Sequence, residues 1–216
     1  IAASRTEDDD QVQLVVVTKT FPASDISLLA ELGVTDVGEN RDQEGRAKRS
    51  GVRSDELRWH MIGRLQRNKV SSVARWADIV ESIDRHELIA PLAGAVERFD
   101  RKPVQVLLQV SLDPMPDPGR GGIDPNDVES LAEAVAGHEA LHLAGVMAVA
   151  PHPDTGVNPR AAFDRLYEIS ALVRASWPNA REISAGMSSD LEAGVAAGAT
   201  QVRIGGAILG ERPPVQ

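Results

Sequence analysis

The sequence contains no cysteine, few aromatic residues and no long apolar run. The lack of cysteine excludes disulfides, thiolate zinc sites, iron–sulfur clusters and cysteine nucleophiles. No apolar run approaches the roughly 20 residues that a membrane-spanning helix needs, and no signal peptide is visible. These absences are typical of a cytoplasmic protein without a membrane partner.

Basic residues are outnumbered in this chain. Its 216 residues include 23 lysines and arginines and 32 acidic residues, which gives a net charge of −9. Nucleic-acid binding proteins gain affinity by neutralising phosphates, so this balance argues against a nucleic-acid partner. The composition, 42% hydrophobic and 25% charged, is that of a globular chain able to bury one core.

Short β-branched runs alternate with longer amphipathic stretches. We predict eight strands, at residues 14–18, 35–38, 57–62, 78–82, 104–111, 143–149, 181–185 and 201–205. We predict helices at residues 23–32, 42–49, 66–76, 85–99, 127–136, 159–176, 190–197 and 207–210. Apolar strands that alternate with helices indicate parallel strands covered on both faces. The pattern therefore predicts one α/β domain over residues 1–216, an eight-stranded βα barrel, with an open doubly wound sheet as the alternative.

Lys19 ends the first predicted strand, and the chemistry of a parallel barrel lies at such strand ends. An ammonium group is costly to desolvate there. A lowered pKa would make Lys19 a nucleophilic amine, suited to forming a Schiff base with an aldehyde. In the alternative interpretation, Lys19 only extends from the barrel mouth into solvent.

Two loops of small residues follow the last two predicted strands. Residues 184–190 read SAGMSSD, and Gly205 and Gly206 follow the eighth strand directly. Small residues let a backbone approach a ligand, and helix N–H groups and serine hydroxyls can bind an anion. Loops after the seventh and eighth strands form the usual phosphate site of such barrels, although ordinary turns have the same composition.

Arg203 lies inside the eighth predicted strand, where its donors need partners. It either pairs with an inward carboxylate or faces a ligand in the barrel. A phosphate site, a lysine suited to aldehydes and an interior cation together fit pyridoxal phosphate.

Five motifs add a resemblance to a known family. They are VVVTKTFPA around Lys19, VGENRDQE from Val37, WHMIGRLQRNK from Trp59, GMSSD from Gly186 and RIGGAILG from Arg203. In this order they resemble the pyridoxal phosphate homeostasis protein family, the single-domain relatives of the alanine racemase barrel. The resemblance extends from about residue 14 to 212. It implies a (β/α)8 TIM barrel, a pyridoxal 5′-phosphate cofactor and an N-terminal helix that is shortened here.

The resemblance also implies roles for individual residues. Lys19 matches the lysine that holds the cofactor as an internal aldimine, and Arg203 matches the arginine that faces the pyridine nitrogen. Further cofactor-binding residues are expected at Asn40, His60, Ser184, Gly186, Met187, Ser188, Gly205 and Gly206, of which Ser188, Gly205 and Gly206 match the phosphate cradle. The family commonly has Thr or Ser at position 206, so one phosphate hydroxyl is missing in this chain.

Binding the cofactor does not define a reaction. A two-base racemase uses a tyrosine opposite the lysine, but the single tyrosine, Tyr167, lies in a predicted outer helix. An arginine at the pyridine nitrogen also makes the ring a weaker electron sink. We therefore expect a monomeric protein that carries or buffers pyridoxal phosphate on Lys19, without strong catalysis, with the cofactor and its apoenzymes as partners. The alternatives are a low-efficiency amino-acid racemase and a cofactor-free Schiff-base aldolase.

One motif suggests a metal site. The run HEALH at residues 138–142 matches a zinc-protease pattern, which needs its two histidines one turn apart on a helix. Gly137 ends the preceding predicted helix, and the residues that follow predict a strand. We therefore predict that HEALH holds no metal.

Overall fold

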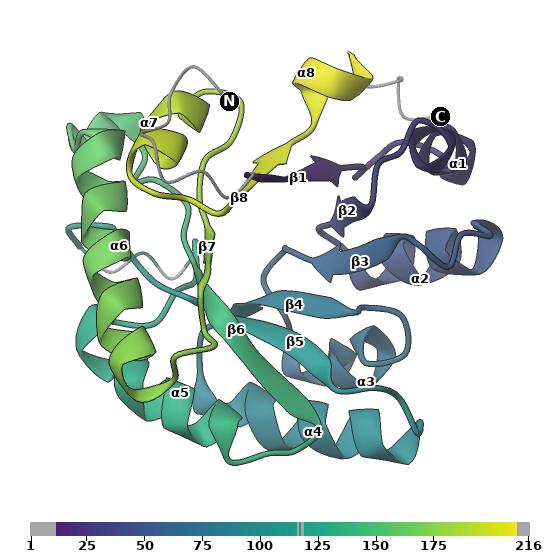
Figure 1. Ribbon diagram of the computed structural model, residues 1–216, viewed down its shortest axis with the longest axis horizontal. Helices are drawn as coiled ribbons and strands as arrows, with labels where there is room; N and C mark the ends of the chain where they lie inside the picture. The colour runs from purple at the N-terminus through teal and green to yellow at the C-terminus, as the bar shows by residue number, and fades with distance from the viewer. Residues whose placement is uncertain (1–11, 116, 118, 211–216) are drawn as a thin grey trace.

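A closed parallel barrel forms the centre of the molecule (Figure 1). The computed structural model describes residues 12–115, 117 and 119–210. Each strand pairs in parallel with the next, and β8 returns to β1. The predicted barrel is confirmed, and the open-sheet alternative is wrong. The strands are β1 (Gln13–Val17), β2 (Asp36–Glu39), β3 (Arg58–Met61), β4 (Ile79–Ile83), β5 (Val104–Gln109), β6 (Leu141–Met147), β7 (Glu182–Ser184) and β8 (Gln201–Ile204).

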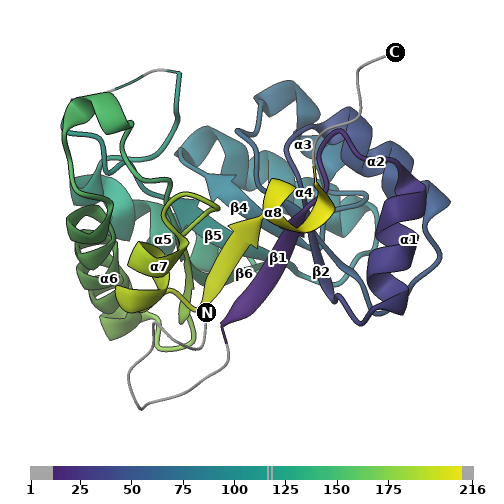
Figure 2. The same ribbon diagram turned by 90° about the horizontal axis from the view of Figure 1, so that it is seen from above.

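Helices follow the strands and surround the barrel (Figures 1 and 2). The α-helices are α1 (Ala23–Glu31), α2 (Asp42–Gly51), α3 (Val70–Val73), α4 (Ile89–Arg98), α5 (Val128–Ala136), α6 (Pro159–Ser176), α7 (Leu191–Ala196) and α8 (Gly206–Leu209). Short 3-10 turns are η2 (Arg67–Lys69), η3 (His86–Leu88), η4 (Pro125–Asp127) and η5 (Pro153–Thr155).

Two predicted helices are shorter in the structure. The segment 66–76 divides into η2 and α3, and the segment 85–99 begins as η3 before α4. Pro91 is the third residue of α4, and proline is tolerated only in the first turn of an α-helix. An α-helix that started at residue 85 would place this proline in its interior, which explains the later start.

The barrel interior has a polar part and an apolar part. Side chains of a strand alternate between two faces, so every second residue faces inward. On β4–β6, Ile79, Leu107, Ala144 and Met147 form a small apolar cluster, apart from the large core between strands and helices. Strands β2, β3, β4, β7 and β8 contribute buried polar and charged side chains that bond to one another: Asp36, His60, Glu81, Ser184, Gln201 and Arg203.

The structure also shows whether the HEALH motif lies on a helix. Helix α5 ends at Ala136 and β6 begins at Leu141, so the motif spans a turn and the start of a strand. The prediction of a non-helical segment is confirmed. Among the described residues, no group of three or more His, Cys, Asp or Glu side chains could hold a metal ion.

Two further expectations concern helices. No helix in the described ranges is long and apolar enough to cross a membrane. The N-terminal helix implied by the family resemblance would precede β1, and it lies outside the described residues.

Candidate functional site

The carboxyl ends of β1 and β8 bring Lys19 and the Gly205–Gly206 turn together. The two strands pair in register, with Val15 opposite Arg203. A Cβ atom on Gly205 would lie only 3.1 Å from the carbonyl oxygen of Val17, so the turn packs closely against the end of β1. Lys19 follows Val17 by two residues and is half-buried. The structure therefore places this predicted lysine and the predicted phosphate turn on adjacent strand ends.

The loop after β7 is fixed by its own backbone. Gly186 has a φ of 96°, in the left-handed region that favours glycine, and its carbonyl accepts a 3.0 Å hydrogen bond from the N–H of Arg203. Asp190 accepts a 2.6 Å hydrogen bond from the N–H of Met187, so its side chain stabilises the loop rather than capping α7. Ser188 and Ser189 are exposed, and within the described ranges their hydroxyls make no hydrogen bond. They are available to an anion.

Arg203 points into the barrel and is only 4% exposed. Its Nη2 donates to the carbonyl of Ala148 at 2.9 Å, and its Nη1 donates to Ser184 Oγ and lies 3.8 Å from Glu81 Oε2. Burial lowers the pKa of Arg203, and the charges of Glu81 and Asp190 oppose that effect. A guanidinium has five N–H donors, and contacts with described residues use two of them as hydrogen bonds. Arg203 therefore has both an inward carboxylate partner and donors left for a ligand.

His60 lies between two buried carboxylates. Its Nδ1 is 2.6 Å from Glu81 Oε1 and its Nε2 is 2.8 Å from Asp36 Oδ1, and all three side chains are fully buried. Burial alone lowers the pKa of His60, but the hydrogen bonds and charges of the two carboxylates outweigh burial and raise it. Each ring nitrogen therefore lies within hydrogen-bond distance of a carboxylate oxygen. His60 has no ring nitrogen left for a ligand, so it lies behind the site.

A second buried cluster fixes the chain on both sides of Lys19. Lys48 of α2 donates to Glu39 Oε1 at 2.8 Å and to the carbonyl of Thr18 at 2.9 Å. The Thr18 hydroxyl donates to the same Glu39 oxygen at 2.5 Å. After Lys19, the N–H of Thr20 donates to Glu44 at 2.9 Å. These contacts lie on the helix side of the barrel wall and hold the backbone around Lys19.

Asn40 follows β2 and lines a cavity of about 270 Å³. Its Oδ1 atom is buried, and no donor in the described part of the chain reaches it. An orphaned buried acceptor is costly, and it suits a pocket-lining residue that meets a ligand. Arg64 and Lys69 also line this cavity, whereas Arg58 pairs with Asp36.

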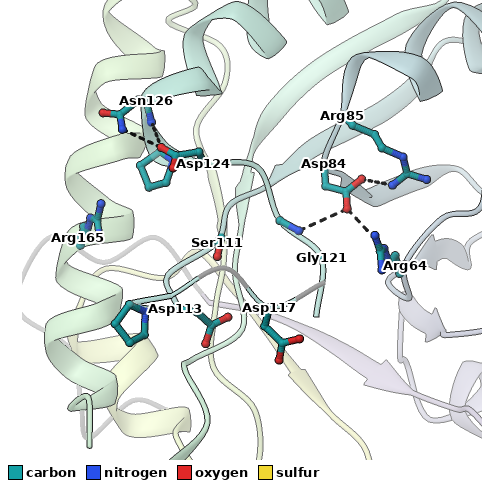
Figure 3. Close-up of a pocket in the computed structure, with 13 residues that line it drawn as sticks. Arg64, Asp84, Arg85, Ser111, Asp113, Asp117, Gly121, Asp124, Asn126 and Arg165 are labelled. Atoms are coloured by element: carbon teal, nitrogen blue, oxygen red, sulfur yellow. Dashed lines mark hydrogen bonds and ion pairs between the residues drawn. The ribbon is translucent and has the colours of Figure 1, made fainter. Parts of the chain in front are cut away.

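A larger cavity of about 480 Å³ lies where β4 and β5 end (Figure 3). Its lining is of mixed charge. Asp84 pairs with Arg85, lies 3.8 Å from Arg64 and accepts from the N–H of Gly122 at 3.4 Å. These contacts tie the long loop after β5 to the end of β4, at the same end of the barrel as Lys19.

Sequence reasoning missed the interior carboxylates. Asp36 and Glu81 lie within the predicted strands at 35–38 and 78–82, in the runs TDVG and DIVES. A charged residue between apolar neighbours of a strand is a signal for an inward partner. Tyr167, in contrast, is where the sequence placed it: it lies on α6, on the outside, and is 45% exposed.

Comparisons with known proteins agree with one another. The family model of the alanine racemase N-terminal domain matches residues 2–213. A pyridoxal phosphate homeostasis protein of Mycobacterium tuberculosis is 40% identical, covering 94% of this chain and 83% of the relative. Its counterpart in Corynebacterium glutamicum is 39% identical, with 95% and 92% covered. The solved structure of PipY from Synechococcus elongatus with PLP bound has a TM-score of 0.84 and 31% identity, and 97% of each chain is covered.

Proposed function

Because this chain belongs to the pyridoxal phosphate homeostasis protein family, within the alanine racemase N-terminal domain family, we propose that it binds pyridoxal 5′-phosphate and takes part in its homeostasis. The observation that carries the proposal is the position of Lys19 and Arg203. One side chain follows β1 and the other points inward from the adjacent β8, at one end of a closed barrel. The relative solved with PLP bound supports the same ligand.

The residues present suit this cofactor. Ser188, Gly205 and Gly206 offer hydroxyl and backbone donors to its phosphate. A Cβ atom on Gly206 would meet nothing within 4 Å, so there is space at this turn. Asn40 offers its buried acceptor to the cavity after β2. Ser184, Gly186 and Met187 shape the loop, and His60 supports the pocket from behind.

Lys19 is the anchor in this proposal. The cofactor, when bound, would supply an aldehyde group, and the amine of Lys19 would hold it there. The contacts of Thr18 and Thr20 hold the backbone on both sides of Lys19. The positive guanidinium of Arg203 disfavours a proton on any ring nitrogen that it faces, because like charges repel. This arrangement suits a carrier or buffer better than a strong catalyst.

Cell context and assembly belong to the same proposal. The large exposed apolar side chains are dispersed over α1, the loop after β5, α6 and α8, which favours a monomer. The absence of cysteine fits a cytoplasmic location. Apoenzymes that need the cofactor are the expected recipients.

The test is a titration of purified protein with pyridoxal phosphate, followed by near-visible absorbance. Wild type and the control variant Lys102→Ala, at an exposed lysine, are expected to form a band that borohydride fixes. Lys19→Ala is expected to form none. An unchanged band in Lys19→Ala would contradict the anchor. Rapid racemisation of alanine by wild type, abolished in Lys19→Ala, would instead make the protein an enzyme.

A further inference from the structure

The carboxylate of Glu81, on β4, contacts side chains from three other strands of the barrel, β3, β7 and β8. Its Oε1 accepts from His60 at 2.6 Å and from Gln201 Nε2 at 2.7 Å, and its Oε2 accepts from the Ser184 hydroxyl at 2.6 Å. The same Oε2 lies 3.8 Å from Arg203 Nη1. We propose that Glu81 is a positioning residue that fixes the orientation of the Arg203 guanidinium, directly and through Ser184. This inference rests on the proposed function.

Ser184 transmits the orientation. A serine hydroxyl has one proton to donate, and Ser184 gives it to Glu81. The lone pairs of Ser184 Oγ are then free to accept from Arg203 Nη1, which they do. Without the carboxylate the serine proton could turn toward Arg203, and the acceptor would become a repelling donor. Glu81 therefore sets the direction in which the Ser184 hydroxyl donates its proton.

The carbonyl of Ala148 cannot fix Arg203 alone. It accepts one bond, from Nη2, and a planar group held at one point can rotate about it. The contacts of Nη1 with Ser184 and Glu81 supply a second fixed point. These two points and the side-chain bond to Nε together define the guanidinium plane, and the remaining donors then point in a set direction.

The charge of Glu81 is balanced on its other side. Asp36, His60, Glu81 and Arg203 form a row of alternating acidic and basic side chains through the barrel. Asp36 in turn accepts from Gln13 at 2.6 Å and pairs with the half-exposed Arg58 at 2.8 Å. Buried charges are tolerated when each has an opposite partner and hydrogen bonds. On the side of β5 and β6 the described side chains Leu107, Ala144 and Met147 are apolar and offer no partner to Arg203.

The first test uses the protein without cofactor. Side-chain N–H signals of Arg203 are observed by NMR and assigned by their loss in Arg203→Lys. A guanidinium fixed by buried partners is expected to give slowly exchanging signals in wild type. Glu81→Gln and Ser184→Ala are expected to broaden or lose them. Asp78→Asn, which removes a carboxylate paired with Arg101 just before β4, is the matched control and is expected to keep them.

The second test uses the cofactor. In Glu81→Gln, the cofactor is expected to remain attached to Lys19 but to bind about tenfold more weakly. The pH dependence of the absorbance band is also expected to change. Asp78→Asn is expected to match wild type in both. A merely structural role of Glu81 would lower stability without moving the band.

The outcomes separate the two proposals. Unchanged Arg203 signals in both Glu81→Gln and Ser184→Ala overturn the positioning role. If Glu81→Gln does not fold, Ser184→Ala alone decides, because it keeps every charge. If wild type forms no band, the proposed cofactor is wrong, and the NMR signals still decide whether Glu81 positions Arg203.

Discussion

Glu39 and Glu81 are both fully buried glutamates of the barrel wall, yet their environments shift their acidities in opposite directions. Burial is the largest effect at each, and it raises a carboxyl pKa. At Glu81 the hydrogen bond and charge of His60, the charge of Arg203 and the Ser184 hydroxyl outweigh burial, so its pKa is lowered. At Glu39 the donors Lys48 and Thr18 do not, and its pKa is raised.

The difference follows from the direction that each side chain faces. Glu81 points into the barrel, where strands from opposite sides converge on it and bond both of its oxygens. Glu39 points outward, where α2 supplies Lys48 and the described residues leave Oε2 without a hydrogen bond. In this barrel, the interior therefore stabilises the charge of Glu81 better than the outer face stabilises that of Glu39. That makes the interior the better place to hold the cation Arg203.

The largest expected effect comes from removing each carboxylate. Glu81→Leu leaves Arg203 without its nearest carboxylate and His60 with Asp36 alone, and is expected to cost about 3–5 kcal/mol of unfolding free energy. Glu39→Leu is expected to cost about 1–3 kcal/mol, because Lys48 keeps the Thr18 carbonyl and lies near Glu44. Urea unfolding of both variants measures the two losses. Equal losses would remove the distinction between the two faces.

A pH dependence of stability is the next effect. The pKa of His60 is raised, so its contribution is fully present below the unfolded value of 6.5 and is lost as pH rises through the folded pKa. The pKa of Glu81 is lowered, so its contribution is present above the unfolded value of 4.5 and is lost as pH falls. The interior row of Asp36, His60, Glu81 and Arg203 therefore contributes most to stability between these two pH values. His60→Gln is expected to remove the loss of stability at alkaline pH, measured as the midpoint of urea unfolding. Plots of that midpoint against pH that run parallel for wild type and His60→Gln would contradict this.

A smaller effect is expected at the outer face. Because the pKa of Glu39 is raised, its ionised form costs stability at neutral pH, and acidification through the raised pKa relieves that cost. Glu39→Gln removes the cost together with the attraction to Lys48. We expect a net change of about 1 kcal/mol or less at pH 7, compared with a clear loss for Glu81→Gln. Matched urea curves for the two amide variants provide the measurement, and a larger loss at Glu39 would reverse the comparison.

The smallest effect is expected at the end of the interior row. Arg58 pairs with Asp36, but its side chain is 46% exposed. Exposed ion pairs contribute roughly 0.2–1 kcal/mol, and salt screens them. Arg58→Gln is therefore expected to lower stability by no more than this, with a smaller difference at high salt. A loss as large as that of Glu81→Leu would mean that the row depends on its exposed end.

The sequence predicted the parts of the molecule that follow from local patterns. Apolar runs located all eight strands, and the strand ends located Lys19 and Gly205. Two partners of Arg203, Glu81 and Ala148, were not predicted, because they lie more than 50 residues away in the chain. Glu81 in DIVES is a single charge in a short run, and its direction depends on strand register. Lys48 was missed because burial of a helical lysine depends on which side of the helix packs against the barrel.

The attachment point of the cofactor is the most direct test of the account. The chain has four lysines, at positions 19, 48, 69 and 102. Protein loaded with pyridoxal phosphate, reduced with borohydride and digested, can be mapped by peptide mass spectrometry. The account predicts a pyridoxyl group on Lys19 alone. A group on Lys48, Lys69 or Lys102 in place of Lys19, or no group at all, would contradict it.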